Sequence, residues 1–471
     1  MTIHIQRAMD YVLSNQERFL ADLKELVAIP SVSLKGFDPR HVDHSAVAVA
    51  SLLKLRGFEN VDVLRIPGAH PYAYGDWLHA PGAPTLLLYA HHDVQPPGRP
   101  ELWKSPAFEP TQRAGRLYGR GTADNKAAVT VYTSAVAAHL KVAGDLPVNV
   151  KVLIEGEEEI GSASLASFVK KHSRKLAADA IVIHDTGNYD TGAPSITTSL
   201  RGLVAMDVTV RTAEKPVHSG VWGGPMPDPV QALSKMLASL TGPDGRMAIP
   251  GIYDRVRVPS QAEQKSLESL RYDEKTFRLQ SGLLPKSRLL GNGKHIFGKI
   301  WFEPALSVNA VEASSRKGWA NIINDSAWCH LGIRTVPDMD PADTARRLKA
   351  HLLANAPWGV KVEFSNLNLN TAWRTDPDLP LFAAAARSLE AGYGRKPVFM
   401  GCGGSIGFVE PFAKALGGVP VILMGLGDPF ANHHGENESM HLGDYFKAIA
   451  SMAHFLREAA APGLWATKKK R

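Results

Sequence analysis

Five short stretches of the chain place a histidine or an acidic residue directly after an apolar, strand-like run. Open α/β sheets build their sites at the carboxyl ends of their strands. Histidine nitrogens and carboxylate oxygens together suit zinc or a similar divalent ion. The chemistry predicted is therefore that of a two-metal hydrolase. The five stretches are 85–93, 119–126, 150–159, 181–185 and 434–438.

His91 and Asp93 end the first of these runs, in the order His91-His92-Asp93. A neutral histidine binds zinc through one ring nitrogen, and its other N–H favours a carboxylate. Residues two apart on extended chain face the same side. We interpret His91 as a ligand and Asp93 as its orienting partner. A polar strand end at the surface is the alternative for this motif alone.

Asp124 directly precedes a stretch of helical character at 125–140. Aspartate is a favoured N-cap residue, so a structural role is one interpretation. The other is that its two oxygens bridge two cations, while Arg120 and Lys126 limit the negative charge of the site.

Glu157, Glu158 and Glu159 are three adjacent carboxylates after another apolar run. They repel one another unless a cation or a proton intervenes. One glutamate that binds metal beside a second held as general base would account for the run. A solvated acidic loop is the alternative.

The elements that carry these residues predict an α/β domain with a mostly parallel sheet. Apolar strand-like runs alternate with helical stretches, which is typical of a parallel sheet covered on both faces. The same character returns after residue 376, with a helix at 442–459. The predicted strands are 61–66, 85–90, 148–154, 180–184 and 419–424.

The pattern changes after Ser199, where strands and helices follow in the order β-α-β-α-β. We expect a small inserted α+β domain at 199–374, within a first domain made of 1–198 and 375–471. The stretch 241–306 is loop-rich, and we predict no helix or strand in it. The inserted elements are strands 203–212, 327–336 and 360–368 and helices 228–240 and 341–354.

Composition indicates a globular protein of 471 residues, 44% apolar and 21% charged. No apolar run approaches the ~20 residues of a membrane span, and Met1–Asp10 has no export signal core, so we expect no membrane partner. Two cysteines, Cys329 and Cys402, fit a cytoplasmic protein, although a disulfide-free exported protein would also fit. The net charge of +7 is dispersed apart from the tail at 468–471, so we expect no nucleic-acid partner.

Four of these motifs, in this order and over nearly the whole chain, resemble a known family. It is the co-catalytic metallopeptidase family of carnosinase-like dipeptidases, aminoacylases and glutamate carboxypeptidases, and the dipeptidase branch is most similar. Residues 89–96 resemble its His-x-Asp-Val-Gln-Pro motif, and 118–126 its Gly-Arg-Gly-x-x-Asp-Asp/Asn-Lys block. Residues 155–162 resemble Glu-Gly-x-Glu-Glu-x-Gly-Ser, and 434–438 the closing histidine–glutamate element.

The resemblance implies two divalent ions, with zinc first and manganese or cobalt as alternatives. It places His91 and Asp185 on one ion. It places Glu159 and His434 on the other, and Asp124 bridges the two.

The resemblance also implies the catalytic roles. Asp93 would orient His91, and Glu158 would be the general acid/base for a water activated by both ions. Glu158 would take the proton of that water and pass it to the leaving amine.

Two motifs of the inserted domain extend the resemblance. Residues 217–224 resemble a His-Ser-Gly-x-x-Gly-Gly element whose histidine, here His218, stabilises the oxyanion, in many members at the partner subunit's site. Residues 333–337 resemble a strand whose arginine, here Arg334, binds the substrate carboxylate. This implies a ferredoxin-like lid and dimerisation domain, and a homodimer. A satisfied histidine and a surface arginine are the alternatives.

The turn Gly401-Cys402-Gly403-Gly404-Ser405 departs from the family, whose dipeptidases often have an Arg-Glu-Gly-Gly-Ser turn. The glycines still allow close backbone approach to a ligand, so we expect Gly403, Gly404 and Ser405 to bind substrate. The missing arginine and glutamate leave the anchoring of the substrate open. We interpret Cys402 as an inert small residue.

The predicted site suggests three candidate functions. The first is a metal-dependent dipeptidase that cleaves an amide beside a free carboxylate. The second is an aminoacylase-type amidohydrolase or a carboxypeptidase acting on N-acyl amino acids with the same metals. The third, a binding relative without metals, is disfavoured by the complete ligand set and Glu158. The first two differ in whether the site offers a carboxylate to a free α-amino group.

Overall fold

The chain forms two compact units. A computed structural model describes residues 2–465 except 271, 291–294 and 315–317, so the basic tail lies outside the described residues. Residues 401–407, which the sequence placed in the first domain, group with unit 2 instead. Unit 1 comprises Met1–Thr198, Thr375–Met400 and Phe408–Arg471, and unit 2 comprises Ser199–Arg374 and Gly401–Gly407.

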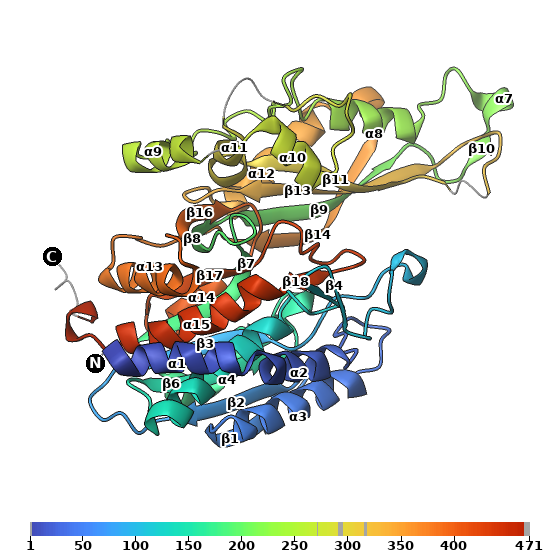
Figure 1. Ribbon diagram of the computed structural model, residues 1–471. Helices are drawn as coiled ribbons and strands as arrows, with labels where there is room; N and C mark the ends of the chain where they lie inside the picture. The colour runs from blue at the N-terminus through green and yellow to red at the C-terminus, as the bar shows by residue number, and fades with distance from the viewer. Residues whose placement is uncertain (1, 271, 291–294, 315–317, 466–471) are drawn as a thin grey trace. The chain divides into compact units, whose positions relative to one another are not determined.

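A mostly parallel sheet lies at the centre of unit 1 (Figure 1). Seven of the nine described strands of this sheet follow the order β1 (Glu59–Leu64), β2 (Tyr72–Trp77), β6 (Asn149–Glu155), β3 (Thr85–His91), β7 (Ala180–Gly187), β17 (Val421–Gly427) and β8 (Ser195–Leu200), and β15 (Trp373–Arg374) and β16 (Val398–Cys402) both pair with β8. The central strands β6, β3, β7 and β17 are parallel, and almost all their residues are buried. The predicted α/β fold is confirmed, although β2 and β8 were not predicted.

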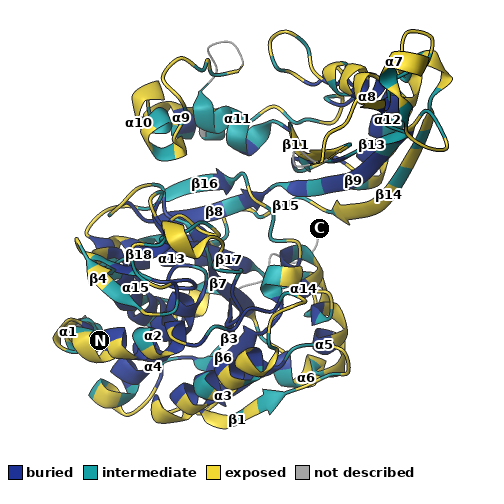
Figure 2. Cartoon of the chain, turned by 90° about the vertical axis from the view of Figure 1, so that its right-hand side faces the viewer, coloured by how far each residue is buried: buried dark blue, intermediate teal, exposed yellow. Residues whose placement is uncertain are grey.

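The two faces of the sheet bury different side chains. Leu88 of β3 belongs to the main apolar core with residues of α4 (Lys126–Ala143) and α15 (Leu442–Glu458). Tyr89 points to the other face, where its ring centroid lies 5.5 Å from that of Phe412 in α14 (Val409–Ala415). Successive strand residues face opposite sides, so helices cover both faces (Figure 2).

The described part of unit 1 also contains further helices, a small separate sheet and three 3-10 turns. They are α1 (Thr2–Ser14), α2 (Gln16–Val27), α3 (Arg40–Leu55), α5 (Leu165–Lys171), α6 (Ser173–Leu176), α13 (Pro380–Tyr393), the small sheet β18 (Ser439–His441), β5 (Arg116–Tyr118) and β4 (Thr111–Arg113), and the 3-10 turns η1 (Pro100–Leu102), η2 (Glu158–Ile160) and η4 (Pro462–Leu464).

Unit 2 is built on an antiparallel sheet with the order β11 (Ala305–Glu312), β13 (Ser326–Thr335), β9 (Gly202–Arg211) and β14 (Lys361–Asn370). Helices α8 (Pro229–Ala238) and α12 (Pro341–Ala354) share an apolar core with this sheet. Each helix begins after an aspartate whose side chain accepts a backbone N–H of the first turn. The chain order β-α-β-β-α-β is that of a ferredoxin-like fold, so the predicted inserted domain is confirmed, with β11 as an additional strand.

The stretch 241–306 contains helices as well as loops, so it is more structured than its loop-rich sequence predicted. Two of these helices have a clear start signal in the sequence. The side chains of Ser260 and Asp273 each accept a backbone N–H of the first helical turn. The remaining described elements of unit 2 are α9 (Gln261–Ser269), α10 (Glu274–Ser281), α11 (Ile296–Phe302), α7 (Ser219–Trp222), η3 (Pro357–Gly359), the paired strands β10 (Val217–His218) and β12 (Ile322–Ile323), and β15 (Trp373–Arg374); β16 (Val398–Cys402) crosses into the turn at 401–407.

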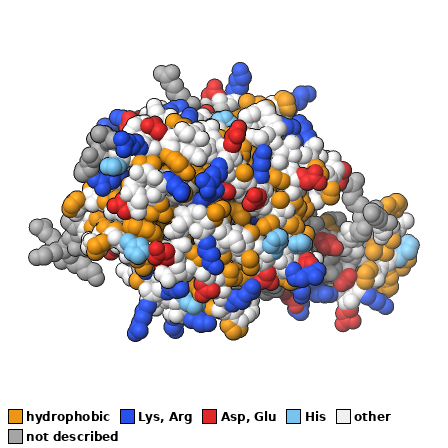
Figure 3. Space-filling model, turned by 60° about the horizontal axis from the view of Figure 1, so that its bottom comes forward, with side chains coloured by type: hydrophobic (Ala, Val, Ile, Leu, Met, Phe, Trp, Pro, Cys, Tyr) orange, Lys and Arg blue, Asp and Glu red, His pale blue; other side chains and the backbone are white. Residues whose placement is uncertain are grey.

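Charge is mixed on the surface. On the face drawn in Figure 3, basic and acidic side chains are interspersed, with no continuous basic stripe on that face. No helix in the described part of the chain has both the length and the apolar character needed to cross a bilayer.

Candidate metal centre and substrate turn

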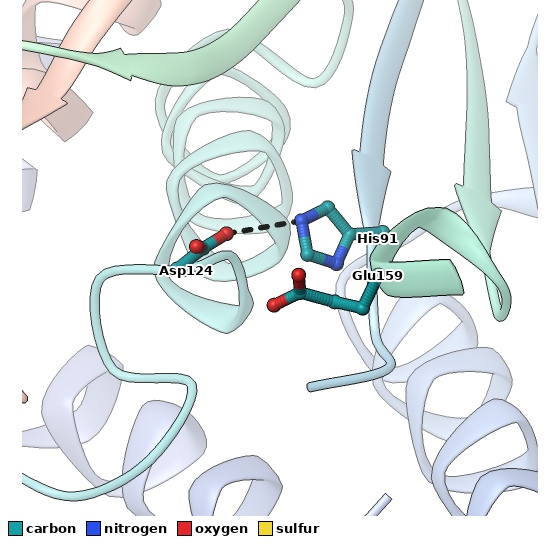
Figure 4. A group of neighbouring side chains, drawn as sticks. All are labelled: His91, Asp124 and Glu159. Atoms are coloured by element: carbon teal, nitrogen blue, oxygen red, sulfur yellow. Dashed lines mark hydrogen bonds and ion pairs between the residues drawn. The ribbon is translucent and has the colours of Figure 1, made fainter. Parts of the chain in front are cut away.

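The predicted metal ligands of unit 1 meet at the carboxyl ends of its parallel strands. His91 ends β3, Asp185 lies in β7, and Glu159 lies in η2, just after β6. Asp124 precedes α4, and His434 follows β17. One ligand atom each of His91, Asp124 and Glu159 lie within 4.8 Å of one another (Figure 4).

His91 turns one ring nitrogen toward carboxylates. Its Nε2 lies 3.2 Å from Asp124 Oδ1 and 3.6 Å from Asp185 Oδ1. Its Nδ1 lies 3.0 Å from the backbone oxygen of Asp93 and 3.4 Å from Asp93 Oδ1. The ring is fully buried, so these contacts fix its orientation.

The second oxygen of Asp124 faces a different histidine. His434 Nε2 lies 3.0 Å from Asp124 Oδ2 and 3.3 Å from Glu159 Oε2. Asp124 therefore stands between two groups, each made of one histidine and one further carboxylate. This is the geometry in which one carboxylate can serve two cations.

The site gathers buried carboxylates close together. Burial raises the pKa of Glu158 well above its usual value and also raises that of Asp185. Burial and the nearby Asp124 charge raise the pKa of Glu159 to about 7. Glu159 Oε1 is buried without a hydrogen-bond partner among the described residues. Divalent cations would compensate this charge, so the donor set fits them.

The pKa of His434 is shifted by the same group of carboxylates. Hydrogen bonds to Asp124 and Glu159 raise its pKa to about 10. Burial alone would raise the pKa of Asp124, but the hydrogen bonds from His434 and His91 outweigh it and lower that pKa. A metal ion takes up only the deprotonated histidine, so metal binding there releases a proton.

The predicted substrate residues belong to unit 2. Arg334 Nη1 donates to Ser405 Oγ at 2.7 Å, in the turn that also contains Gly403 and Gly404. His218 is exposed at the start of α7, and its Nδ1 accepts the Gly220 N–H at 3.0 Å. The structure thus brings Arg334 and Ser405 together, while His218 lies on a separate tip of unit 2.

A family model described as Peptidase family M20/M25/M40 matches residues 87–458. The chain belongs to this family. It is therefore an enzyme, a metallopeptidase, as the sequence motifs predicted.

Similar M20 proteins carry dipeptidase names. The "Cysteinylglycine-S-conjugate dipeptidase" of Corynebacterium striatum is 32% identical over 448 residues, covering 94% of this chain and 95% of the relative. The "Beta-Ala-His dipeptidase" of Homo sapiens is 29% identical, covering 97% and 93%. The predicted resemblance to the dipeptidase branch is confirmed.

Solved structures of the family have the same fold along the whole chain. The dipeptidase Dug1p from Saccharomyces cerevisiae has a TM-score of 0.86 at 26% identity, covering 98% of this chain and 100% of that one. The M20 metallo-carboxypeptidase Sso-CP2 from Sulfolobus solfataricus has a TM-score of 0.81 at 28% identity, covering 94% and 99%.

Sequence reasoning missed several residues that position the M20 site. Ser33 Oγ donates to Asp93 Oδ2 at 2.6 Å, and the backbone N–H groups of Glu158 and Glu159 donate to the same carboxylate at 3.1 and 3.0 Å. Asp93 therefore holds the η2 turn as well as His91. Ser33 lies far away in sequence and belongs to no motif, so no local signal marks it.

Glu438 and Asn125 hold the two aspartates. The buried Glu438 carboxylate accepts Arg120 Nη1 at 2.6 Å and the backbone N–H groups of Gly121, Ala123 and Asp124 at 2.9 to 3.1 Å. Asn125 Nδ2 donates to Asp185 Oδ1 at 3.0 Å. Both residues lie inside motifs that resemble the family, at 118–126 and 434–438, so these motifs could have pointed to them.

Proposed function

We propose that this peptidase hydrolyses the amide bond of dipeptides or short peptides that end in a free carboxylate. The names of its M20 relatives support a dipeptide substrate. The observation that carries the proposal is Asp124, whose two oxygens face two separate histidine–carboxylate groups. A second candidate, cleavage of N-acyl amino acids or carboxypeptidase action, draws support from the similar metallo-carboxypeptidase.

We assign His91 and Asp185 to one divalent ion, and Glu159 and His434 to the other, with Asp124 shared. Zinc is the first candidate, and manganese or cobalt would suit the same donors. When bound, such ions polarise a scissile carbonyl and make a water acidic enough to attack near neutral pH.

Glu158 is our assignment for the general acid/base. Its Oε2 lies 3.9 Å from His91 Nε2, beside the proposed ligands. Burial raises its pKa, which suits a group that must both accept a proton and return it. It would take the proton of the attacking water and give it to the leaving amine. Asp93 supports this role by binding the Glu158 backbone N–H.

We assign the substrate carboxylate to Arg334 and to the turn of Gly403, Gly404 and Ser405. His218 would donate to the developing oxyanion. Its exposure at the tip of α7 supports action on a second copy of the chain, and we therefore propose a homodimer. A cytoplasmic location, and the lack of nucleic-acid and membrane partners, stay predictions.

One experiment tests the division of labour between neighbouring glutamates. Glu158→Gln should keep both metals and lose at least ~10²-fold in kcat, the usual scale of general acid/base catalysis. Glu159→Gln should lose metal, measured by elemental analysis after dialysis. Activity is followed on a panel of dipeptides and their N-acetyl amino acid counterparts. Equal metal loss in both variants would contradict the assignment, and a preference for N-acyl substrates would select the second candidate.

A further inference from the structure

Two arginines of unit 2 converge on the glycine turn at 401–407. Arg201 directly precedes β9, and Arg334 lies in the neighbouring strand β13, where it pairs with Leu203. Arg201 Nε donates to the Gly403 oxygen at 2.8 Å, and Arg334 Nη1 donates to Ser405 Oγ at 2.7 Å. The guanidinium groups thus bind positions two residues apart in the same turn.

Arg201 lies just before β9, and all its hydrogen bonds in the described part of the chain go to neutral backbone oxygens. Its backbone N–H reaches the Gly404 oxygen at 3.1 Å, and its Nη1 donates to the backbone oxygen of Glu303 at 3.3 Å. No hydrogen bond to Nη2 is present among the described residues. Within that part of the chain, neither Arg201 nor Arg334 forms an ion pair with a carboxylate.

Three arginines elsewhere in the described part of the chain are more deeply buried, and they are paired. The side chains of Arg56, Arg116 and Arg120 are 2%, 12% and 1% exposed, and each forms an ion pair with an aspartate or a glutamate. Arg201 and Arg334 are half-buried and have no such partner. Burial lowers the pKa of both, and burial together with the Arg334 charge lowers that of Arg201 to about 10. The neighbouring Cys402 offsets part of this lowering in both arginines. Two cations held together without a carboxylate favour the binding of an anion.

The turn is packed so that the arginines are held in place. A Cβ at Gly401 would lie 2.7 Å from the Cβ of Trp301, and one at Gly403 would lie 2.7 Å from Ile300 Cγ2. Helix α11 and the Arg201 guanidinium therefore both pack closely against Gly403. A site fixed in this way loses little entropy when a ligand binds.

We propose that Arg201 is a second cation of the substrate carboxylate site and that, with Arg334, it restricts the enzyme to substrates with a free terminal carboxylate. This rests on the proposed peptidase function and adds to it a residue outside the assigned set. The missing arginine of the turn is thereby replaced from a different segment of the chain. Arg201 acts through its charge, in addition to its hydrogen bond to Gly403.

The test compares Ala-Gly with Ala-Gly-amide in the zinc-loaded enzyme. Arg201→Gln keeps a donor for the Gly403 oxygen but removes the charge. We expect kcat/KM for Ala-Gly to fall about 10- to 100-fold, mainly through KM, on the scale of a charged hydrogen bond. The value for the amide should stay nearly unchanged. Arg201→Lys, which restores the charge, should recover part of the preference for the free acid.

Controls separate this role from a structural one. Arg211→Gln removes an exposed arginine from the same strand, β9, and should behave as wild type. If Arg201 only holds the turn, Arg201→Gln will weaken both substrates equally and Arg201→Lys will not restore the preference, and the proposal is overturned.

Failure of the proposed function gives a different result. In that case the wild-type enzyme, loaded with zinc, manganese or cobalt in turn, hydrolyses no dipeptide. Calorimetric titration of Ala-Gly and Ala-Gly-amide then decides on Arg201 alone. Weaker binding of Ala-Gly to Arg201→Gln by about 10-fold or more supports the proposal. Equal binding, or no binding to either protein, overturns it.

Discussion

We expect Glu438→Gln to lower both the free energy of unfolding of the enzyme and its affinity for metal. The carboxylate is fully buried, and it faces only donors, from Arg120 and from the backbone of Gly121, Ala123 and Asp124. In Glu438→Gln, an amide NH₂ group would point at some of these donors. The Arg120 charge would remain buried without its counter-ion.

The size of the loss follows from burial. Breaking one partner of a buried ion pair costs about 3–5 kcal/mol. Arg120 keeps hydrogen bonds to the backbone oxygens of Pro96, His434 and Gly435, which compensate part of this. We therefore expect a loss of ~3 kcal/mol in the free energy of unfolding. Because Glu438 also fixes the Asp124 backbone, metal affinity should fall by about 10- to 100-fold.

The assay is urea unfolding of chelated protein, followed by circular dichroism, with a separate zinc titration against a competing chelator. Glu436→Gln is the matched control, because it removes the same charge from the same loop at the exposed pair with Arg99. It should leave stability close to that of wild type. A loss of less than ~1 kcal/mol in Glu438→Gln, or an equal loss in both variants, would refute the reasoning.

Three further outcomes are expected. Exhaustive chelation should abolish hydrolysis, and zinc, manganese or cobalt should restore it; full activity of protein shown to be metal-free would exclude the mechanism. Mixing inactive His218→Ala with inactive Glu158→Gln should regenerate activity if His218 serves the partner subunit, whereas no recovery despite proven subunit exchange would place it in its own chain. Burial lowers the pKa of His139, whose ring nitrogen lies 2.7 Å from the Ala453 oxygen, so this group stabilises the fold fully above about pH 6.5 and progressively less below it. The unfolding free energy of His139→Gln should therefore fall less than that of wild type between pH 7 and 5.5, and identical slopes would contradict this.

Much of the fold was predictable because its central strands are apolar on both faces. Such runs mark parallel strands directly, as in β3 and β17. Strand β11 was missed although residues 306–310 alternate between apolar and polar. The alternation is short and follows a loop-rich stretch, and most of its residues are exposed, so pairing with β13 is what defines the strand. The grouping of residues 401–407 with unit 2 could not be predicted from the sequence, because their partners, Arg201 and Arg334, are distant in sequence.

The candidate site was predictable where the chemistry is local in sequence. His91 with Asp93, and Glu158 with Glu159, are adjacent enough for their roles to be proposed from spacing. The contacts of Ser33 could not be proposed, because a single serine has no pattern until the fold brings it to Asp93.

The position of β17 has a consequence for synthesis of the chain. It lies between β7 and β8, yet the ribosome makes it only after the main segment of unit 2. At ~5–20 residues per second, β7 waits roughly 10 to 50 s for this neighbour. During that time an apolar strand edge is open to wrong pairing, and His434 does not yet exist to hold metal. Aggregation of this enzyme is therefore expected to begin on the nascent chain, and to increase when translation of the inserted segment slows.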